Sequence, residues 1–399
     1  MVKIKTLTNL DSVTLKEWEK LWNLHSDHFF NSPIWFLACV KAKEIRNYNI
    51  HLIYNSVQEN PALRGGDELN SDMSSSLGKP RLLRRGGCHR KRKILAILPL
   101  VKGMKYGIGV CEFPGGELID KPPFLIIEKS NRVINAIRQI LAETDNLYLT
   151  QIDDELDRIV NFGNLKWFFS SQKSESPYLP LNGDPFEYMN SKNRKRLFKL
   201  YDSYKKDLKF IDFKKVTKKN IKYAVEIDKK SSKVSRGLNS LSSRSAQQAL
   251  LEKLIDFCPE CLSVNIMYYK HIPVIYSIGI IHNKIYQAIL TAFDNDFRFM
   301  VPGKTRLCFL LPYLAKNGYE LINFGNGLSG YKTDLTPFFS SHKDYYHSIN
   351  PIIFCWFKCV YFIEKQLKDN SFIYKYFCLI RGAVRNVKFH TPKNWRKSK

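Results

Sequence analysis

The segment from Val301 to Arg306 has the residue types of an anion-binding helix start. It reads Val-Pro-Gly-Lys-Thr-Arg and lies between a predicted strand and a predicted helix. The first N–H groups of a helix have no intrahelical acceptor, and the helix dipole adds partial positive charge there. Gly303 would let a ligand approach the backbone, with Lys304, Thr305 and Arg306 in the first turn. A pyrophosphate would fit this environment, but a Pro-Gly turn without any ligand has the same pattern.

A second segment can present two polar side chains at the end of a strand. Residues 323–332 read Asn-Phe-Gly-Asn-Gly-Leu-Ser-Gly-Tyr-Lys and directly follow a predicted strand. The glycines permit a tight loop, from which Tyr331 and Lys332 would project. The alternative is a glycine-rich hairpin in which Tyr331 packs and Lys332 is solvated.

Two predicted α/β domains must position these segments. The chain has 399 residues, which suits two domains better than one core. Strands and helices alternate over residues 1–170 and again over residues 177–345. In the second domain, apolar runs between residues 262 and 291 predict an antiparallel meander before a helix at 303–317.

Two stretches differ from these domains in composition. Residues 55–92 contain few apolar side chains, which predicts a flexible insertion in the first domain. Residues 346–399 predict a helical tail rich in aromatic and basic residues. This tail could pack on the second domain, or it could contact the headgroups of an anionic membrane.

The formal net charge is +26. Most of the excess lies in Lys79–Lys93, in Lys192–Lys222 and in the tail after Asp369, which contains no acidic residue. A field of this sign favours an anionic partner: a nucleic acid, a phosphorylated cofactor or the acidic face of a membrane. For each cluster alone, a solvated surface is an equally good interpretation.

The cysteines and the N-terminus indicate a compartment. Nine cysteines, an odd number found mostly in apolar runs, predict reduced core thiols. Cys258 and Cys261 form a CxxC without a second pair at zinc-finger spacing, so we expect no metal. The N-terminus has no apolar signal core, and no run approaches the ~20 apolar residues that span a bilayer. These features predict a cytoplasmic protein, peripheral to the inner face of the membrane if the tail binds lipid.

Three segments in a fixed order resemble the BioF2-like (CelD-like, cellulose-biosynthesis-associated) acetyltransferases, a branch of the GNAT superfamily. They are residues 177–196, with Pro-Tyr-Leu-Pro-Leu and Lys-Asn-Arg-Lys-Arg, residues 292–303, with Ala-Phe-Asp and Val-Pro-Gly, and residues 323–332. Val301 stands where that family has Ser, Asn323 where it has Asp, and Asn326 where it has Arg. The chain is also distantly similar to the Fem aminoacyl-tRNA-dependent peptide ligases, in which an aromatic–lysine pair stands at the place of Tyr331–Lys332.

The resemblance implies an α/β fold of two tandem GNAT-like domains, with mixed central sheets flanked by helices. It implies an acyltransferase that moves an acyl group, acetyl first, from acetyl-CoA or another acyl-CoA to an amine or hydroxyl of a small-molecule, saccharide or envelope-related acceptor. Backbone N–H groups near 287–291 would stabilise the oxyanion. The residues that it implies are catalytic Lys332, Tyr331 and Asp294, donor-binding Val301, Gly303, Lys304, Thr305 and Arg306, and substrate-binding Arg194, Arg196 and Asn326.

Two alternatives remain open at this point. One is a Fem-like ligase that takes its acyl group from aminoacyl-tRNA, which the positive charge would suit. The other is a non-catalytic protein of the same fold that binds nucleic acid or a membrane.

Overall fold

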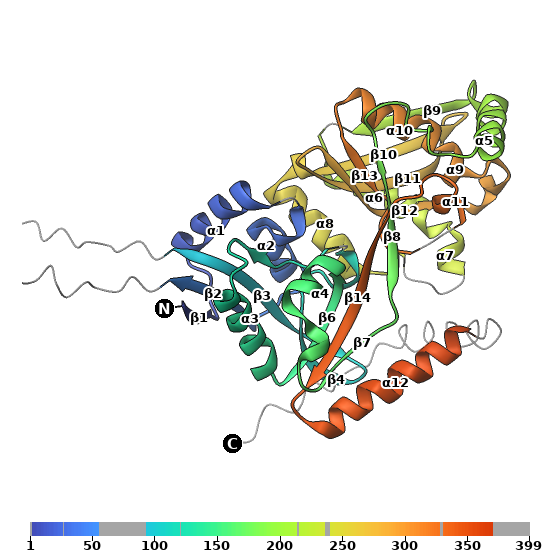
Figure 1. The fold of residues 1–399 in the computed structure, drawn as a ribbon. Coiled ribbons are helices and arrows are strands. Elements are labelled where there is room, and N and C mark those ends of the chain that lie inside the picture. Colours follow the sequence, from blue (N-terminus) through green and yellow to red (C-terminus); the bar gives the residue numbers. More distant parts are fainter. Residues whose placement is uncertain are drawn as a thin grey trace, which may run out of the picture.

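The computed structural model describes residues 2–26, 28–55, 93–119, 121–213, 215–235, 240–327 and 330–369 (Figure 1). Residues 56–92 of the predicted insertion and 370–399 of the predicted tail lie outside this part of the chain. The described residues form two α/β halves that share one mixed sheet of 14 strands, with helices on its faces. The predicted fold class, α/β with two tandem units around mixed sheets, is confirmed.

Helix α2 of the first half begins where the sequence places it. Ser32 accepts a hydrogen bond from the Trp35 N–H at 3.0 Å, and Pro33 takes the first helical position. The elements of this half are β1 (Val2–Leu7), α1 (Ser12–His25), η1 (Phe29–Asn31), α2 (Pro33–Ala42), β2 (Tyr48–Asn55), β3 (Ile94–Lys105), β4 (Ile108–Glu112), η3 (Gly116–Leu118), β5 (Leu125–Ile126), α3 (Asn131–Glu143), β6 (Asn146–Asp153), α4 (Asp154–Val160), η4 (Phe162–Asn164), β7 (Phe168–Ser170) and β8 (Ser174–Pro180).

The second half begins with a basic helix, α5. Its N-cap, Asn190, accepts a hydrogen bond from the Asn193 N–H, and Leu197 is its only buried residue. The elements are α5 (Ser191–Tyr204), β9 (Leu208–Phe213), α6 (Lys218–Lys229), α7 (Ser232–Ser235), α8 (Ser245–Phe257), η5 (Pro259–Cys261), β10 (Leu262–Tyr269), β11 (Ile272–His282), β12 (Ile285–Phe293), η6 (Asn295–Met300), α9 (Pro302–Thr305), α10 (Leu307–Lys316), β13 (Leu321–Asn323), α11 (Gly330–Thr333), β14 (Phe339–Ser348) and α12 (Pro351–Asp369).

Both halves contain the same crossover. The path through the sheet is β1-β2-β3-β4-β6-β14-β8-β13-β12-β11-β10-β9. Strands β4 and β6 run parallel with α3 between them in sequence, and strands β12 and β13 run parallel with α9 and α10 between them. The other pairs are antiparallel, among them the predicted meander β10-β11-β12, which is confirmed.

Strands β14 and β8 join the two halves. β14 pairs with β6 of the first half on one side and with β8 on the other, while β8 also pairs with β13 of the second half. In Figure 1 these two strands form the long ladder that runs between the halves. The sheet of the first half is therefore completed by a strand that comes late in the chain. The proposed boundaries at residues 170, 177 and 345 fall at the end of β7, inside β8 and inside β14.

The main core is also shared. One cluster of buried apolar residues takes in Trp18, Trp35 and Ile97 of the first half and Leu251 and Ile266 of the second. Helix α2 packs against α8 across this cluster. A core of this kind, together with the shared sheet, fixes the halves relative to each other.

Helix α12 packs on the sheet of the first half. Phe357 is fully buried against Val110 of β4 and Tyr346 of β14, and Phe354 contacts the ring of Phe169 on β7. The interpretation that the tail packs on the second domain is wrong for this helix, because β14 has carried the chain back to the first half before α12 begins.

Gly279 on β11 tests the packing under the meander. A methyl group at this position would overlap the ring of Tyr286, which is fully buried. We expect Gly279→Ala to lower the free energy of unfolding by about 1–3 kcal/mol, measured by urea denaturation. Gly109→Ala on β4 is the matched control, because a methyl group there meets nothing within 4 Å. Equal effects of the two substitutions would contradict this packing.

Candidate functional site

The sheet of the second half opens between β12 and β13. These strands pair in parallel only as far as Gln287 and Asn323. β13 ends at Asn323, whereas β12 continues to Phe293. Residues 288–293 therefore have no partner strand on that side among the described residues. Backbone groups of this stretch that point to the open side can pair with an extended ligand, apart from the Thr291 carbonyl, which accepts a hydrogen bond from Lys233.

A β-bulge distorts β12 inside this opening. The pairing with β11 shifts register between Ala288 and Leu290, so that Ile289 is the extra residue. A bulge redirects the groups of the strand that carries it, and bulges are frequent beside active sites. The N–H groups near 287–291, from which the sequence predicts oxyanion stabilisation, lie on this stretch.

Val301 has a left-handed backbone conformation where the chain enters α9, with φ 48° and ψ 60°. A β-branched residue rarely adopts this conformation, which costs about 1–3 kcal/mol and is typical of ligand sites. The carbonyl oxygen of Val301 accepts hydrogen bonds from the N–H groups of Lys304 at 2.9 Å and Thr305 at 3.1 Å. Beside Gly303 there is open space, since a methyl group there would meet nothing within 4 Å. The space beside the Gly303 backbone is therefore open.

Three predicted site residues turn their side chains into the protein. Thr305 is fully buried and its hydroxyl donates to a main-chain carbonyl at 2.6 Å. Arg306 is buried and donates from Nη1 to Ser277 Oγ at 3.0 Å. Asp294 is buried, caps η6 and lies 3.3 Å from Lys230 Nζ. These contacts give the three side chains a structural role, and a role in direct contact with donor or acceptor stays a prediction.

A chain of polar groups continues from Arg306 under the meander. Ser277 Oγ lies 3.5 Å from the hydroxyl of Tyr286, which is 3.1 Å from Asn265 Oδ1, and Asn265 in turn donates to Asp212. Burying a guanidinium group is costly unless it is hydrogen-bonded. The series of hydrogen-bonded polar groups meets part of this requirement, although Arg306 Nε has no partner among the described residues. These polar contacts connect the start of α10 to the sheet.

A pocket of about 370 Å³ brings α5 and the start of α9 together. Arg196 and Lys199 line it from α5, and Val301 and Lys304 line it from the other side. Lys304 Nζ lies 3.0 Å from a carboxylate oxygen of Asp334, which also lines the pocket. Three predicted residues from distant parts of the sequence, Arg196, Val301 and Lys304, thus share one cavity in which cations outnumber acids.

The glycine-rich loop is held by Lys332 and by β14. Lys332 Nζ donates to the carbonyl oxygens of Gly325 at 3.1 Å, Asn326 at 3.4 Å and Gly327 at 3.2 Å. The side chain of Asn326 lies 3.0 Å from His342 Nε2. Lys332 therefore shapes the loop that closes one side of the opening. The side chain of Tyr331 lies outside the described part of the structure.

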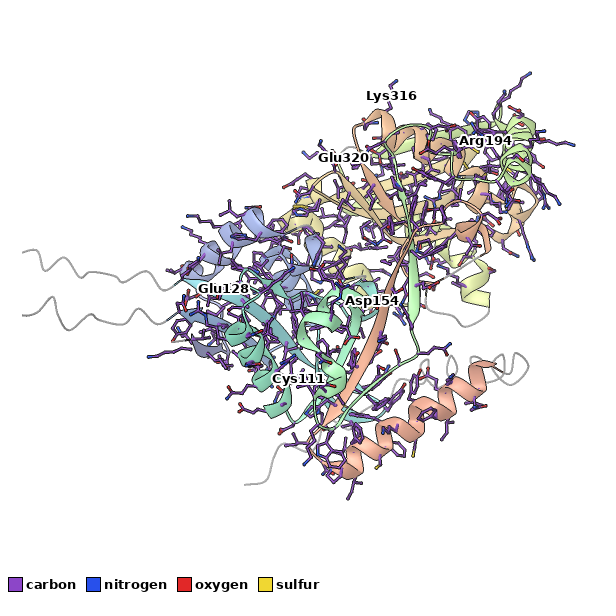
Figure 2. The ribbon with its side chains drawn as sticks, viewed as in Figure 1. Cys111, Glu128, Asp154, Arg194, Lys316 and Glu320 are labelled. Atoms are coloured by element: carbon purple, nitrogen blue, oxygen red, sulfur yellow. A yellow bond between two sulfur atoms is a disulfide. The ribbon has the colours of Figure 1, made fainter. Side chains whose placement is uncertain are left out.

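Arg194 lies apart from this pocket. Its guanidinium group pairs with Asp184 at 2.6 Å on the exposed side of α5, where Figure 2 labels it. Both side chains are more than a third exposed, so the pair contributes little to stability. Arg194 remains accessible to an anionic ligand only at the surface.

Lys233 was not predicted. Its ammonium group donates to the carbonyl oxygen of Thr291 at 2.9 Å, within the unpaired part of β12. Burial lowers its pKa, which a nearby carboxylate, Asp228, partly offsets. The sequence around it, Ser-Ser-Lys-Val-Ser, has no apolar pattern that would indicate a partly buried lysine.

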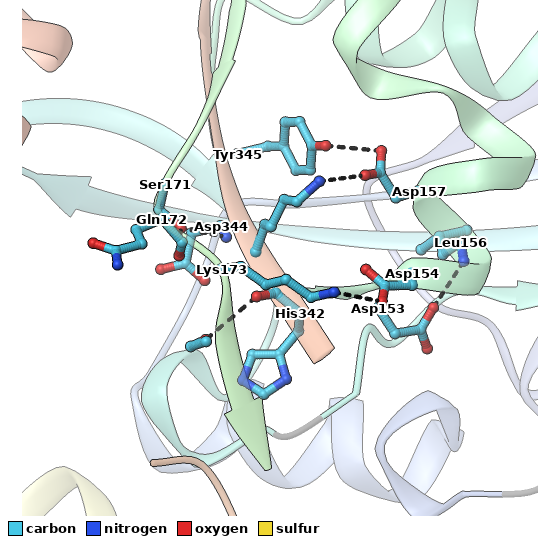
Figure 3. A network of polar contacts seen from close by, with 12 residues as sticks. Asp153, Asp154, Leu156, Asp157, Ser171, Gln172, Lys173, His342, Asp344 and Tyr345 are labelled. Atoms are coloured by element: carbon cyan, nitrogen blue, oxygen red, sulfur yellow. Dashed lines mark hydrogen bonds and ion pairs between the residues drawn. The ribbon is translucent and has the colours of Figure 1, made fainter. Parts of the chain in front are cut away.

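A polar network fixes β14 at the junction of the halves (Figure 3). Asp157 of α4 pairs with Lys343 at 3.1 Å and accepts a hydrogen bond from the Tyr345 hydroxyl at 2.8 Å. Lys173 pairs with Asp154 at 3.1 Å beside them. The contacts of Asp157 bind β14 to α4 of the first half, and His342 on the same strand contacts Asn326 in the loop of the second half.

Cys258 and Cys261 form a disulfide bond after α8. The expectation of reduced thiols throughout is therefore wrong for this pair, because η5 brings the two sulfur atoms together. Cys39, Cys111, Cys308, Cys355 and Cys359 are free.

Comparisons with known proteins support the fold. The sequence matches no protein-family model and no curated protein. Among solved structures, the chain is similar to FemX, with a TM-score of 0.54 and 9% identity over 88% of this chain and 99% of that one. It also matches the C-terminal domain (DUF2156) of a putative lysylphosphatidylglycerol synthetase from Agrobacterium fabrum, with a TM-score of 0.46 and 12% identity over 66% of this chain and 84% of that one. A tandem GNAT protein from the clavulanic acid biosynthesis pathway matches with a TM-score of 0.45 and 10% identity over 88% of this chain and 99% of that one.

At 9% identity the similarity to FemX shows a shared fold and no more. A BioF2-like subfamily stays a prediction.

His342 should make stability depend on pH. Burial lowers its pKa to about 4, from an ordinary value of 6.5. The unfolded chain therefore takes up a proton at a higher pH than the folded chain, and stability falls as pH decreases from about 6.5 to about 4. We expect His342→Gln, whose amide can still bond Asn326, to lose less thermal stability between pH 7 and pH 5 than the natural chain does. An identical loss in both would contradict this origin. His51, with its pKa lowered to about 4, supplies a residual dependence.

Proposed function

We propose that this chain is a GNAT-type acyltransferase that transfers an acyl group, acetyl first, from acyl-CoA to an amine or hydroxyl of an acceptor such as a saccharide. One observation carries the proposal: an unpaired, bulged stretch of β12 opens directly beside the start of α9. The first offers backbone groups to an extended thioester donor, and the second offers Gly303 and nearby cations to its phosphates.

The charges around the pocket suit a phosphorylated donor. Arg196 and Lys199 come from α5, and Lys304 comes from α9. Asp334 neutralises one of these cations, which leaves a net positive lining. The opening beside Gly303 allows a phosphate to reach the backbone there. Residues 288–293 are then the candidates to bind the donor's pantetheine arm.

The reaction that fits is direct acyl transfer. The acceptor amine or hydroxyl attacks the thioester carbonyl, the carbon–sulfur bond breaks, and the proton lost by the acceptor finally reaches the thiolate. The main requirement is that donor and acceptor are held together. The N–H groups around Ile289 are the candidates to stabilise the oxyanion. In this proposal Tyr331 protonates the thiolate.

Lys332 has two roles in this scheme. In the structure it binds three carbonyl groups of the loop 325–327. A cation at this place also offsets negative charge that develops in the opening. Lys233, which donates to Thr291 on the opposite strand, is the second cation at the opening.

A specific observation also favours the Fem-like alternative. Helix α5 carries Lys192, Arg194, Lys195, Arg196 and Lys199 within two turns and buries only Leu197. A surface of this kind suits a polyanion. The affinity for tRNA would then fall by about 10³-fold or more between 50 and 200 mM salt. CoA has too few charges to show so large an effect.

Donor binding can be tested by calorimetric titration with CoA and acetyl-CoA. We expect Gly303→Trp to weaken binding by at least tenfold, because the indole would fill the space beside the backbone. Gly163→Trp is the matched control, since Gly163 also has open space around it but lies in the first half. We expect Arg196→Gln with Lys199→Gln to weaken binding by about tenfold or more, since each removes a charged contact. Lys192→Gln with Lys195→Gln, on the same helix but outside the pocket, should not.

No binding of either ligand by the natural chain would contradict CoA as donor. The Fem-like alternative would then be tested by titration with aminoacyl-tRNA.

Lys332 can be tested by steady-state kinetics once an acceptor is found. We expect Lys332→Met to lower kcat by about 10²-fold and to leave the unfolding temperature nearly unchanged, because the loop it holds is exposed at Asn326 and Gly327. Lys332→Arg should retain more activity than Lys332→Met. Full activity of Lys332→Met would remove the residue from the mechanism.

A further inference from the structure

Helix α12 is anchored to the body by the aromatic side chains of one face and by the indole N–H of Trp356. Phe354, Phe357 and Tyr361 pack on the aromatic rings of Phe169 and Tyr346. Three hydrogen bonds reinforce this contact: Tyr106 OH donates to Glu364 at 2.7 Å, the Gln172 N–H donates to Tyr361 OH at 2.6 Å, and Trp356 Nε1 donates to the Tyr106 carbonyl at 3.1 Å. The orientation of the helix is therefore fixed.

The opposite face of α12 is apolar and exposed. Its residues follow each other at spacings of three, one, three, three and one, which places them on one side of a helix. The large side chains are 50–78% exposed, and a further apolar residue, Ile349, lies half-exposed just before the helix. The members of this outer face are Ile352, Cys355, Trp356, Cys359, Phe362 and Ile363. An apolar patch of this kind, fixed in place, marks an interaction surface.

The charges next to the outer face indicate its partner. Lys358 and Lys365 lie on α12 at the border between the two faces, and Lys358 Nζ is 4.7 Å from the ring centroid of Phe354. The one acid with a described side chain, Glu364, is engaged by Tyr106. The 30 residues that follow, 370–399, contain eight Lys or Arg and no Asp or Glu. Trp and Phe on an apolar face, with Lys and Arg around it, are typical of helices that lie in the interface of an anionic bilayer. Each basic residue near such a surface adds about 1 kcal/mol of attraction.

A second copy of the chain suits this face less well. Pairing of two outer faces would bring together two basic regions of a chain with a net charge of +26, and like charges across an interface oppose association. No described helix of the chain is long and apolar enough to cross a bilayer.

We propose that the outer face of α12 docks on an anionic phospholipid surface, with the helix parallel to the bilayer and its aromatic side chains among the headgroups. In Figure 1, α12 and α5 lie at opposite ends of the molecule. A chain docked in this way carries its α5 pocket away from the lipid. The proposal is independent of the acyl donor.

The two exposed thiols provide a built-in probe. We expect vesicles that contain phosphatidylglycerol to slow maleimide alkylation of Cys355 and Cys359, measured by mass spectrometry of the full chain, by at least tenfold. Vesicles of phosphatidylcholine alone should not, because they lack the charge. Unchanged alkylation in the presence of anionic vesicles would overturn the proposal.

Vesicle co-flotation with a matched pair of variants completes the test. We expect Phe362→Ser with Ile363→Ser to weaken partition into anionic vesicles by about tenfold or more for each side chain. Val13→Ser with Leu24→Ser is the control, because these residues are as exposed but lie on α1. Equal partition of both variants would overturn the proposal. So would thiols that react slowly without any lipid, which would mean that residues 370–399 or a second copy already cover the face.

Discussion

The pairing of β14 with two strands at once is the constraint on which the rest of the structure depends. Its hydrogen bonds reach β6 on one side and β8 on the other within one stretch of ten residues. Because β8 pairs in turn with β13 of the second half, the sheet passes from one half to the other without an edge. Lys343 and Tyr345 fasten the strand to Asp157 of α4. The halves therefore cannot slide or hinge without breaking a sheet.

The same pairing positions the candidate site. The loop 325–327 is bound to β8 by the hydrogen bond from the Gly327 N–H to Glu175, and to β14 by the contact of Asn326 with His342. The loop is thus held against the junction of the halves, while α9 is held against the meander by Arg306 and Ser277. The opening between them is bounded by two separately anchored walls. Such preorganisation lets a site act through positioning.

Local signals in the sequence predicted much of this structure. The Ser32-Pro33 start of α2, the meander and the helix after Gly303 follow from caps, turns and apolar runs that act over a few residues. The pairing of β14 with β6 does not, because it joins residues about 190 apart and no local pattern specifies the partner of a strand. The sequence also did not predict the direction in which the side chains at the start of α9 point. Thr305 and Arg306 read as ligand-facing in a helix start, yet both side chains point inward.

The buried position of Arg306 explains why a basic residue at a helix start need not meet an anion. Its guanidinium group is satisfied in part by Ser277, and through Tyr286 and Asn265 the chain of hydrogen bonds reaches Asp212. A positive charge held at the end of such a chain still adds to the field at the start of α9, a few residues away. Positive charge at the candidate donor site thus comes from two sets of residues. Arg196, Lys199 and Lys304 line the pocket where solvent and ligand can enter, and Arg306 lies behind it in the interior, where screening by water is weakest.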